Sequence, residues 1–495
     1  MQLNNLQEFC QYYQQGKNFI ITRELNADLE TPVALYKKLV KLSPYSLLFE
    51  SAEKDKHKGR YSAIALKPDL IWECKDFTVT IKNQTKQLSQ AKLAAPEIKK
   101  SLEDFISKAK LNEDEKLPAI ASGIFGYMSY DMVKYFDDIN LPEHDEIDIA
   151  DAIFIRPTIL LVCDNLTDSL TICLPIWYDK QNEAADIFQQ KQTELAEICT
   201  LLSKAASCSK ADTDAADVEF SSNYTEAEFC QKVELAKQYI KAGDVFQVLP
   251  SRRFKAKFAT EGLALYRALR KLNPSPFLFY LHFKDFEIIG SSPEIMVRVA
   301  QDEVTIRPLA GTRKRGLNEA EDQALAEDLL ADQKEVAEHL MLIDLGRNDV
   351  GRVSAENSVK VTKYMEIEYY SHVMHISSTV TGQLAADKSC LDSLIAGFPA
   401  GTVSGAPKIR AMEIISELET VRRSFYSGCV GYFSLHQKHM DMAIMLRTSL
   451  IKDGYLYGQS GAGIVHDSVP QSEFEETENK FRIIRKAAEL AKQFS

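Results

Sequence analysis

The predicted β-strands of this chain follow one another directly, and this feature restricts its fold more than any other. The strand-like runs are rich in β-branched and aromatic residues, and they occupy 77–81, 158–162, 246–249, 277–283, 287–289, 295–299, 428–435, 441–447 and 455–458. Consecutive strands with short connections form antiparallel hairpins, because a parallel pair needs a crossover of about a dozen residues. The order therefore predicts an α+β fold with antiparallel sheets and argues against a doubly wound fold.

Helical periodicity predicts the remaining long elements. Helical patterns occur at about 97–110, 183–205, 225–242, 319–344 and 470–493. The segment at 225–242 ends at Gly243, a residue type that favours the left-handed conformation just beyond a helix. Residues 319–344 are predicted to form one long amphipathic helix.

A change of composition after residue 200 divides the chain. Residues 206–222 are small and polar and contain no aromatic side chain except Phe220, which predicts a linker or a long loop. The chain has 495 residues, enough for two large domains on either side of it, at 1–205 and 223–495.

Charge and cysteine content exclude several classes of protein. Lysine and arginine number 59 against 71 acidic residues, and a net charge of −12 makes nucleic acid and anionic membrane surfaces poor partners. The nine cysteines include no CxxC pair, which indicates free thiols in a reducing compartment rather than a disulfide framework. The sequence shows neither a signal peptide pattern nor an apolar run of about 18 residues. We therefore expect a soluble cytoplasmic protein.

Two pairs of glutamates at helical spacing are candidate ligands for a divalent cation. Glu335 and Glu338 are three positions apart, as are Glu473 and Glu476, and Lys480 shares the face of the second pair. Magnesium often takes one or two protein carboxylates and leaves sites for water and substrate. From spacing alone, solvated acidic helix faces are the commoner explanation.

Other residues indicate anion binding and proton transfer. The glycine-rich runs 397–408 and 458–463 could bring backbone N–H groups close to an anion, although taken alone they are more often ordinary turns, and neither matches a nucleotide-binding motif. His375 lies in a strand-like stretch, where it is either a proton acceptor or a structural histidine. Arg447 follows an apolar strand, and a buried arginine needs an anion or a carboxylate partner.

Several motifs stand in a fixed order along the second half of the chain. They are GDVFQVLPS (243–251), NPSPFLFYL (273–281), GSSPE (290–294), IRPLAGTRKRG (306–316), KEVAEHLMLIDLGRNDVGRV (334–353), HVMHISSTVTG (372–382), FPAGTVSGAPKIRAMEII (398–415), GYF (431–433), MAIMLRT (442–448), GAGIV (461–465) and EFEETENK (473–480). Together they resemble the motifs of the chorismate-utilising enzymes, and most closely those of the anthranilate synthase component I family. The first 200 residues resemble the family's regulatory portion more loosely, through 47–51 and 123–130.

The resemblance implies a fold and a reaction. The fold is a large antiparallel β-sandwich flanked by helices, with a regulatory portion at 1–205 and a chorismate-binding catalytic domain at 223–495. In the reaction, ammonia adds at C2 of chorismate as the C4 hydroxyl leaves, and elimination of pyruvate then yields anthranilate, the first step of tryptophan biosynthesis.

The resemblance also implies roles for individual residues. Glu338 and Glu476 would bind Mg²⁺, with Glu335 and Glu473 supporting them through water. Glu294 would protonate the departing C4 hydroxyl and His375 would accept the C2 proton, as acid–base chemistry requires. The remaining implied residues line the site or bind substrate carboxylates, and they are Thr402, Gly311, Thr312, Tyr432, Arg447, Gly461, Ala462, Gly463 and Lys480.

Two positions distinguish this chain from other members of the family. Aminodeoxychorismate synthases typically carry a nucleophilic lysine where this chain has Ala310, and isochorismate and salicylate synthases use a lysine where it has Gln247. Both differences favour ammonia as the nucleophile and anthranilate as the product. Aminodeoxychorismate synthase component I, of the folate pathway, stays the alternative, because some of these enzymes lack the lysine. A catalytically dead regulator is a weaker alternative, since Glu294, Glu338, His375 and Glu476 are all present.

Partners and regulation follow from the same resemblance. No cysteine lies in a nucleophile elbow, so ammonia must come from solution or from a separate glutamine amidotransferase subunit, anthranilate synthase component II, in a heterotetramer. Tryptophan is the expected feedback inhibitor. Its pocket would contain Glu50, Ser51, Pro276, Phe277 and Leu278, although these residues could instead pack a domain interface.

Overall fold

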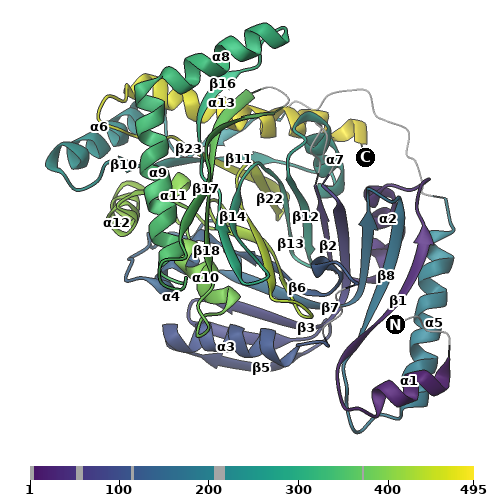
Figure 1. Cartoon of the computed structure of the whole chain (residues 1–495). Coiled ribbons are helices and arrows are strands. Elements are labelled where there is room, and N and C mark those ends of the chain that lie inside the picture. Colours follow the sequence, from purple (N-terminus) through teal and green to yellow (C-terminus); the bar gives the residue numbers. More distant parts are fainter. Residues whose placement is uncertain (1–4, 52–58, 113–115, 206–217, 371–372, 495) are drawn as a thin grey trace.

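Two long strands, β3 (Tyr61–Lys75) and β7 (Ala152–Asp164), each belong to both sheets of a β-sandwich (Figure 1). The structure is a computed structural model that describes residues 5–51, 59–112, 116–205, 218–370 and 373–494. In β3, residues 63–66 pair with one sheet and residues 71–75 with the other, and the register of β3 against β7 shifts between Pro68 and Leu70. In β7, residues 160–164 pair with β8 of the first sheet, and residues 152–155 pair with β6 of the second sheet. The sheet ladders are antiparallel, which confirms the predicted α+β sandwich.

The first sheet has the order β9-β11-β23-β22-β13-β12-β2-β3-β7-β8-β1. Its other strands are β9 (Ser221–Ser222), β11 (Ser251–Lys257), β23 (Tyr455–Gly461), β22 (Thr448–Lys452), β13 (Phe286–Ser292), β12 (Phe277–Phe283), β2 (Tyr45–Glu50), β8 (Ser169–Ile176) and β1 (Phe19–Asn26). The pairing of β2 with β12 joins the N-terminal part of the chain directly to the part that follows residue 223.

The second sheet has the order β5-β4-β3-β7-β6-β20-β21-β14-β15-β18, and β18 also pairs with β16 and β17. These strands are β5 (Gln87–Lys92), β4 (Thr78–Lys82), β6 (Gly123–Met128), β20 (Cys429–Ser434), β21 (His439–Ile444), β14 (Ile295–Ala300), β15 (Glu303–Ile306), β18 (Val373–Gln383), β16 (Leu309–Lys314) and β17 (Lys360–Tyr369). A separate two-stranded ladder joins β10 (Gln247–Val248) to β19 (Gly405–Ala406).

Alternation along the strands divides the core into two layers. Leu47 belongs to the apolar cluster that contains residues of both sheets, such as Val297, whereas its neighbour Leu48 belongs to the cluster beneath the helices of the first sheet. Successive side chains of a strand point to opposite faces, so the central strands of the first sheet supply both layers. Burying a leucine in this way contributes about 1.5–3 kcal/mol.

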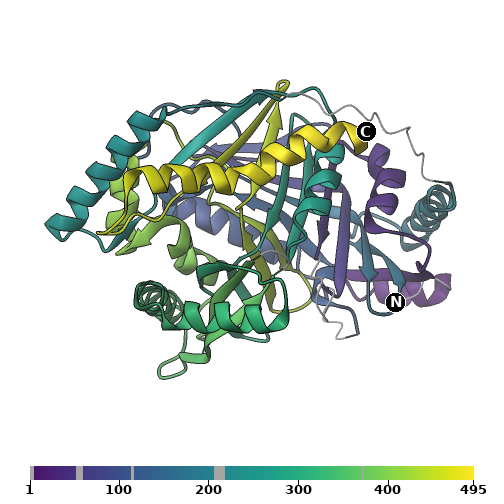
Figure 2. The same ribbon diagram turned by 90° about the horizontal axis from the view of Figure 1, so that it is seen from above.

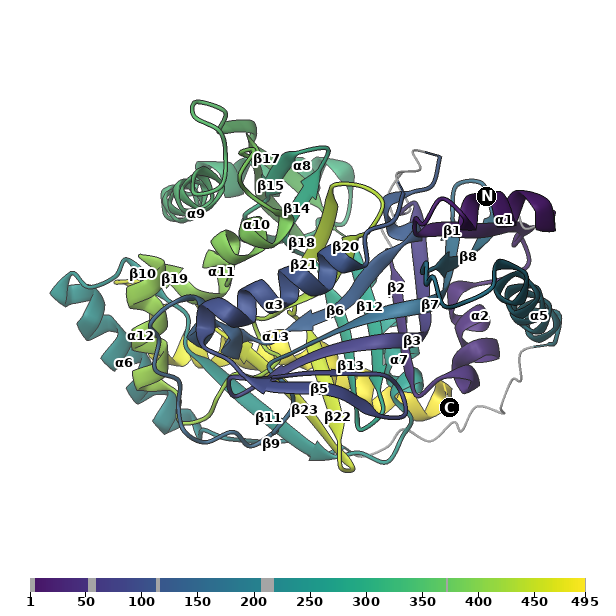
Figure 3. The ribbon, with the colours of Figure 1, turned by 90° about the horizontal axis from the view of Figure 1, so that it is seen from below.

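Helices cover the outer faces of both sheets. Those on the first sheet are α1 (Leu6–Tyr13), α2 (Pro32–Leu39), α5 (Ala184–Leu202), α7 (Gly262–Leu272) and α13 (Pro470–Leu490). Figure 2 shows α13 lying lengthwise across the molecule, and it contacts α6 (Glu226–Ala242) and α7. Figure 3 shows α3 (Ala95–Lys108) on the side of the molecule opposite to α13. The other helical segments are α4 (Val133–Phe136), α8 (Glu319–Ala331), α9 (Gln333–Gly351), α10 (Cys390–Gly397), α11 (Gly401–Ser404), α12 (Lys408–Leu418), η1 (Val40–Leu42), η2 (Ala119–Ala121), η3 (Tyr130–Met132) and η4 (Ala491–Phe494).

The prediction of one helix over residues 319–344 is wrong. The structure has two helices, α8 and α9, and Asp332 between them has ψ of 102°, outside the helical region. The Asp332 carboxylate accepts hydrogen bonds from the backbone N–H groups of Lys334 and Glu335, so it caps the second helix. The turn that carries Glu335 and Glu338 therefore starts a new helix at Asp332, which is also the last capping residue of α8.

The predicted linker lies largely outside the described residues, which leave out 206–217. Of its remainder, Ser221 and Ser222 form the edge strand β9 beside β11. The division into a regulatory portion and a catalytic domain stays a prediction. Within the described residues, no helix is long and apolar enough to cross a membrane.

Candidate active site

A cavity of about 590 Å³ opens between α9, α13 and the ends of several strands. It brings together most of the residues predicted from the sequence, and these are Glu294, Gly311, Thr312, Glu335, Glu338, His375, Thr402, Arg447, Gly461, Gly463, Glu473, Glu476 and Lys480. They come from segments up to 186 positions apart in the chain, so the fold alone assembles the site.

The four predicted carboxylates line the cavity in two pairs, one on α9 and one on α13. Gln247 donates its amide N–H to Glu338 Oε1 at 2.8 Å, and Lys480 Nζ forms an ion pair with Glu476 Oε1 at 2.6 Å. Burial raises the pKa of Glu335, and the negative charge of Glu338 raises it further. Burial also raises the pKa of Glu473, where Glu476 adds to the effect. A bound cation would relieve this repulsion.

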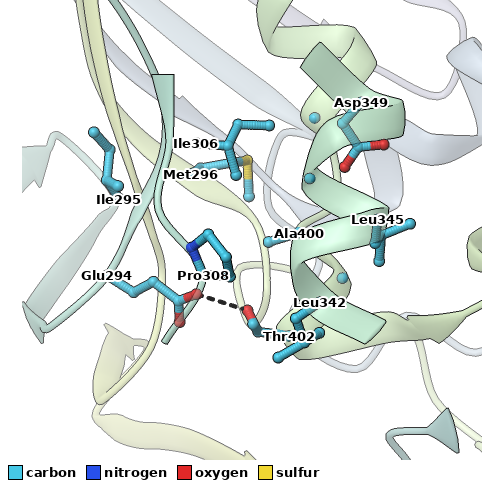
Figure 4. A pocket seen from close by; sticks show the side chains of 13 residues that line it. Glu294, Ile295, Met296, Ile306, Pro308, Leu342, Leu345, Asp349, Ala400 and Thr402 are labelled. Atoms are coloured by element: carbon cyan, nitrogen blue, oxygen red, sulfur yellow. Dashed lines mark hydrogen bonds between the residues drawn. The ribbon is translucent and has the colours of Figure 1, made fainter. Parts of the chain in front are cut away.

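Glu294 and Thr402 meet at the wall of the cavity. Glu294 follows β13, its side chain is buried, and Thr402 donates a hydrogen bond from Oγ1 to Glu294 Oε1 at 3.0 Å (Figure 4). A cavity of about 20 Å³, large enough for one water molecule, lies against this pair. Burial raises the pKa of Glu294 to about 8, although the Thr402 hydroxyl, the Leu309 amide and the charge of Lys480 act in the opposite direction. The carboxyl is therefore protonated at neutral pH and can act as an acid.

His375 is oriented by a backbone carbonyl. Its Nδ1 lies 2.8 Å from Gly311 O and 3.1 Å from Thr312 Oγ1. Because a carbonyl only accepts, Nδ1 carries the proton and Nε2 is the basic nitrogen of the neutral ring. Burial lowers the pKa of His375, and the charges of Arg447 and Lys480 lower it further. The ring is therefore neutral at pH 7 and can accept a proton.

A left-handed glycine makes this orientation possible. Gly311 has φ of +67°, and the register between β16 and β18 shifts between Ala310 and Arg313. A side chain at Gly311 would be strained by this conformation and would approach Glu335 to about 3.2 Å. The shift in register directs the Gly311 carbonyl toward the imidazole.

Two cationic side chains can receive carboxylates. Arg447 has φ of +47° and lies in the irregular segment between β21 and β22. The strand predicted over 441–447 ends earlier, at Ile444. Arg447 forms no salt bridge to any residue that the structure describes, and its Nη1 lies 3.3 Å from Asn273 Oδ1. Burial lowers its pKa, as expected for a charge that lacks a counter-ion. Lys480 pairs with Glu476 and donates to Gly461 O at 3.1 Å.

Two predicted residues do not line this cavity. Ala462 is fully buried, and its N–H donates to Pro250 O at 3.2 Å, so this amide already has an acceptor. Tyr432 lines a different cavity, where its ring stacks on Phe125 and His439. The position follows from β20, in which Tyr432 faces the space between the two sheets.

That second cavity, of about 760 Å³, contains the residues predicted for an effector. Glu50, Ser51, Pro276, Phe277 and Leu278 all line it. The Glu50 carboxylate already has partners, because Arg270 donates to both of its oxygens at 3.0 Å and the Tyr266 hydroxyl donates as well. The effector cavity shares Glu294, Pro293 and Leu309 with the candidate active site.

Some residues that line the cavity were not among the predicted site residues. Lys334, Tyr426, Gln459 and Ser460 face the active-site cavity. Lys334 directly precedes the first glutamate pair, and Gln459 and Ser460 lie within the second glycine-rich run, so proximity to known motifs could have found these three. Tyr426 lies in a segment without a motif, and only the tertiary structure places it there.

Comparison with known proteins identifies the family. The profile of the chorismate binding enzyme family matches residues 58–486. The chain belongs to the chorismate binding enzyme family. Anthranilate synthase component 1 of Cereibacter sphaeroides is 43% identical over 496 residues, which cover 100% of this chain and 99% of the relative.

Solved structures of chorismate binding enzymes have the same fold. Anthranilate synthase component I from Streptococcus pneumoniae superposes with a TM-score of 0.76 at 35% identity, covering 87% of this chain and 93% of that chain. The menaquinone-specific isochorismate synthase from Escherichia coli gives a TM-score of 0.71 at 19% identity, covering 98% of each chain. The second likeness shows the fold alone, so the reaction must be argued from the site and from the closer relatives.

Proposed function

We propose that this chain is the large subunit of an anthranilate synthase, which converts chorismate and ammonia to anthranilate, pyruvate and water. The observation that carries the proposal is an acid and a base in one cavity: a protonated Glu294 and a neutral His375 line it together with Arg447 and Lys480. Full-length relatives at 42–43% identity are named anthranilate synthase component 1.

The proton transfers follow from this arrangement. Glu294 gives its proton to the C4 hydroxyl, which leaves as water while ammonia forms the C2–N bond. The adduct is 2-amino-2-deoxyisochorismate. His375 then takes the C2 proton through Nε2, and the C–O bond to the enolpyruvyl group breaks as the ring becomes aromatic. The enolpyruvate that leaves takes up a proton at its methylene carbon to become pyruvate. Hydroxide is a poor leaving group, so the protonated state of Glu294 is essential to the first step.

Gln247 and Ala310 support ammonia as the nucleophile. Gln247 lines the cavity, and its amide N–H group is bound to Glu338. A neutral amide is a poor base for activating water, and the methyl group of Ala310 cannot form a covalent intermediate. Ammonia needs neither form of help, because it is itself a good nucleophile when unprotonated.

Magnesium is the proposed cofactor, held by Glu338 and Glu476 with Glu335 and Glu473 beside them. When bound, it would neutralise the ring carboxylate of chorismate and orient the ring. The described residues include no group of three or more His, Cys, Asp and Glu side chains that could hold a metal ion. Magnesium commonly uses one or two carboxylates and takes its other ligands from water and substrate. The raised pKa values of Glu335 and Glu473 support a cation between the two helices.

The proposed partner is a glutamine amidotransferase subunit, and the proposed inhibitor is tryptophan. The name component 1, carried by the relatives, implies a second component. The chain itself has no cysteine in a nucleophile elbow. For tryptophan, the effector cavity offers Ser51 for the polar end of the ligand and Pro276 and Phe277 for an indole ring, whereas the Glu50 carboxylate is bound by Arg270 and Tyr266.

Product analysis tests the proposed function. The purified chain is incubated with chorismate, magnesium and ammonium at mildly alkaline pH, where part of the ammonium is free ammonia. We expect fluorescent anthranilate from ammonium and none from glutamine until an amidotransferase subunit is added. Formation of a 4-amino product or of isochorismate would reject the proposal.

A further inference from the structure

One buried arginine contacts the turn of α13 that carries the proposed cation ligand Glu476. Arg252, on β11, is only 3% exposed. Its Nη1 donates to Thr477 Oγ1 and to Glu478 Oε1, both at 3.0 Å, and its Nη2 donates to Tyr224 O at 3.3 Å. The guanidinium therefore contacts the helical turn that also contains Glu476.

Aromatic rings enclose the same guanidinium. Its carbon lies 4.1 Å from the centroid of Phe474, 5.0 Å from that of Phe254 and 5.8 Å from that of Phe229. Cation–π attraction is strongest where water is excluded, as it is here. Phe474 stands between Glu473 and Glu476 in the sequence, so this contact also acts on the ligand turn.

A second contact fixes the same turn from the neighbouring strand. Ser460 pairs with Arg252 in the ladder of β11 and β23, and its Oγ donates to Thr477 O at 2.8 Å. Thr477 is completely buried. Arg252 and Ser460 thus hold one turn of α13 at two points, and both points belong to a rigid pair of strands.

We propose that Arg252 is a positioning residue for the cation site, setting the rotation and the height of α13 so that Glu473 and Glu476 face the carboxylates of α9. This inference rests on the magnesium site proposed above. A carboxylate about 5–6 Å from the helix axis moves about 1 Å for a rotation of 10°. Magnesium demands nearly ideal octahedral geometry, so a displacement of this size weakens its binding. A lysine at position 252 would offer one ammonium group in place of the planar guanidinium, so it could make only part of these contacts.

The test compares magnesium binding by Arg252→Gln, Arg252→Lys and a matched control, Arg485→Gln. Arg485 also donates to Glu478, at 3.2 Å to Oε2, but makes none of the contacts to Thr477 or Phe474. Calorimetric titration with MgCl₂ measures binding without turnover. We expect binding about tenfold weaker in Arg252→Gln, an intermediate loss in Arg252→Lys and no change in Arg485→Gln. At saturating magnesium, kcat and the KM for ammonium should stay within about twofold of the wild type, which a general loss of structure would not allow.

The outcomes separate this inference from the proposed function. Wild-type affinity for magnesium in a folded Arg252→Gln variant would overturn the role of Arg252 alone. If that variant does not fold, Arg252→Lys decides, and unchanged affinity there overturns the role equally. If neither the wild-type chain nor Glu338→Gln binds magnesium, the metal site itself is rejected, and the role of Arg252 is rejected with it.

Discussion

At the scale of single residues, the acid and the base of the site are held in opposite protonation states by the same physical effect. Burial disfavours the charged form of each group, so it raises the pKa of Glu294 to about 8 and lowers that of His375. The rate should therefore fall at acid pH, as His375 gains a proton, and above about pH 8, as Glu294 loses one.

Replacing Thr402 with valine should move the alkaline limb of the pH–rate profile to higher pH. The Thr402 hydroxyl stabilises the ionised form of Glu294 and so lowers its pKa. Without this hydrogen bond, worth about 1 kcal/mol, the pKa of Glu294 should rise and the limb should move upward by about half to one pH unit. The measurement is kcat/KM for chorismate against pH. A limb that stays in place or moves downward would show that Thr402 does not act on the Glu294 carboxyl.

Replacing His375 with alanine should uncouple the two steps of the reaction. The C4 hydroxyl can still leave, because Glu294 is intact, but no base remains for the C2 proton. We expect anthranilate formation to fall by about 10²–10⁴-fold and 2-amino-2-deoxyisochorismate to accumulate, as measured by chromatography of the products. His466→Ala is the control, since it removes an exposed histidine that does not line the cavity. Normal anthranilate formation by His375→Ala would exclude the histidine as the base.

The identities of these residues could be predicted from the sequence, but not all of their positions. Glu294, His375 and Thr402 lie within long motifs, and the structure brings all three to one cavity. Tyr432 lies in a motif as well, yet it faces the effector cavity. Which face of β20 meets which cavity depends on its pairing with β6, more than 300 residues away in the chain, and no local pattern contains that information.

At the scale of elements, a buried ion pair joins the helix that carries Glu335 and Glu338 to α12. Lys408 Nζ lies 2.8 Å from Asp349 Oδ2, and both side chains are only 8% exposed. Lys408 also donates to Ala396 O, in α10, at 3.4 Å. Burial raises the pKa of Asp349, although Lys408 acts in the opposite direction. Each charge is therefore tolerated only because the other is present.

Removing one member of this pair should be much more harmful than removing both. Lys408→Met leaves a buried carboxylate without a partner and should lower the free energy of unfolding by about 3–5 kcal/mol. The double variant Lys408→Met with Asp349→Leu should recover most of that loss, as measured by urea denaturation. Asp387→Ala, which removes an exposed pair with Lys388, should change stability by less than about 1 kcal/mol. A double variant no more stable than the single one would show that the pair contributes through its hydrogen bonds rather than its charges.

Element boundaries were predictable where the signal is local. The helix α6 begins with a capping box formed by Thr225 and Glu228 and ends at Gly243, which has φ of +86°, so its predicted and observed limits agree within one residue. The break between α8 and α9 was missed because helical periodicity runs through Asp332 and outweighs its local capping of α9. A tertiary contact adds to the cap, since Asp332 also pairs with Arg313, on a strand of the second sheet, at 2.9 Å.

At the scale of the whole molecule, the effector cavity lies between the two sheets. Its walls include Phe49 and Phe279 from the first sheet and Arg298 and Val430 from the second. A ligand bound there contacts both layers of the sandwich at once. The shared wall formed by Pro293, Glu294 and Leu309 then connects it to the candidate active site. The sequence predicted the two sets of residues, but the common wall depends on long-range strand pairing and was not predictable.

Tryptophan and chorismate should therefore weaken each other's binding by the same factor. If tryptophan favours an arrangement of the two sheets that binds chorismate poorly, thermodynamic linkage requires the reverse effect to be equal, and couplings of this kind are about 5–150-fold. The measurement is calorimetric titration of tryptophan with and without chorismate and magnesium, on a variant such as His375→Ala that slows turnover. Ser51→Phe places a ring in the mouth of the effector cavity and should weaken tryptophan binding, whereas Ser107→Phe, at an exposed site on α3, should not. Equal tryptophan affinity in the two phenylalanine variants would remove Ser51 from the effector site, and unchanged affinity in the presence of chorismate would show that the shared wall transmits no coupling.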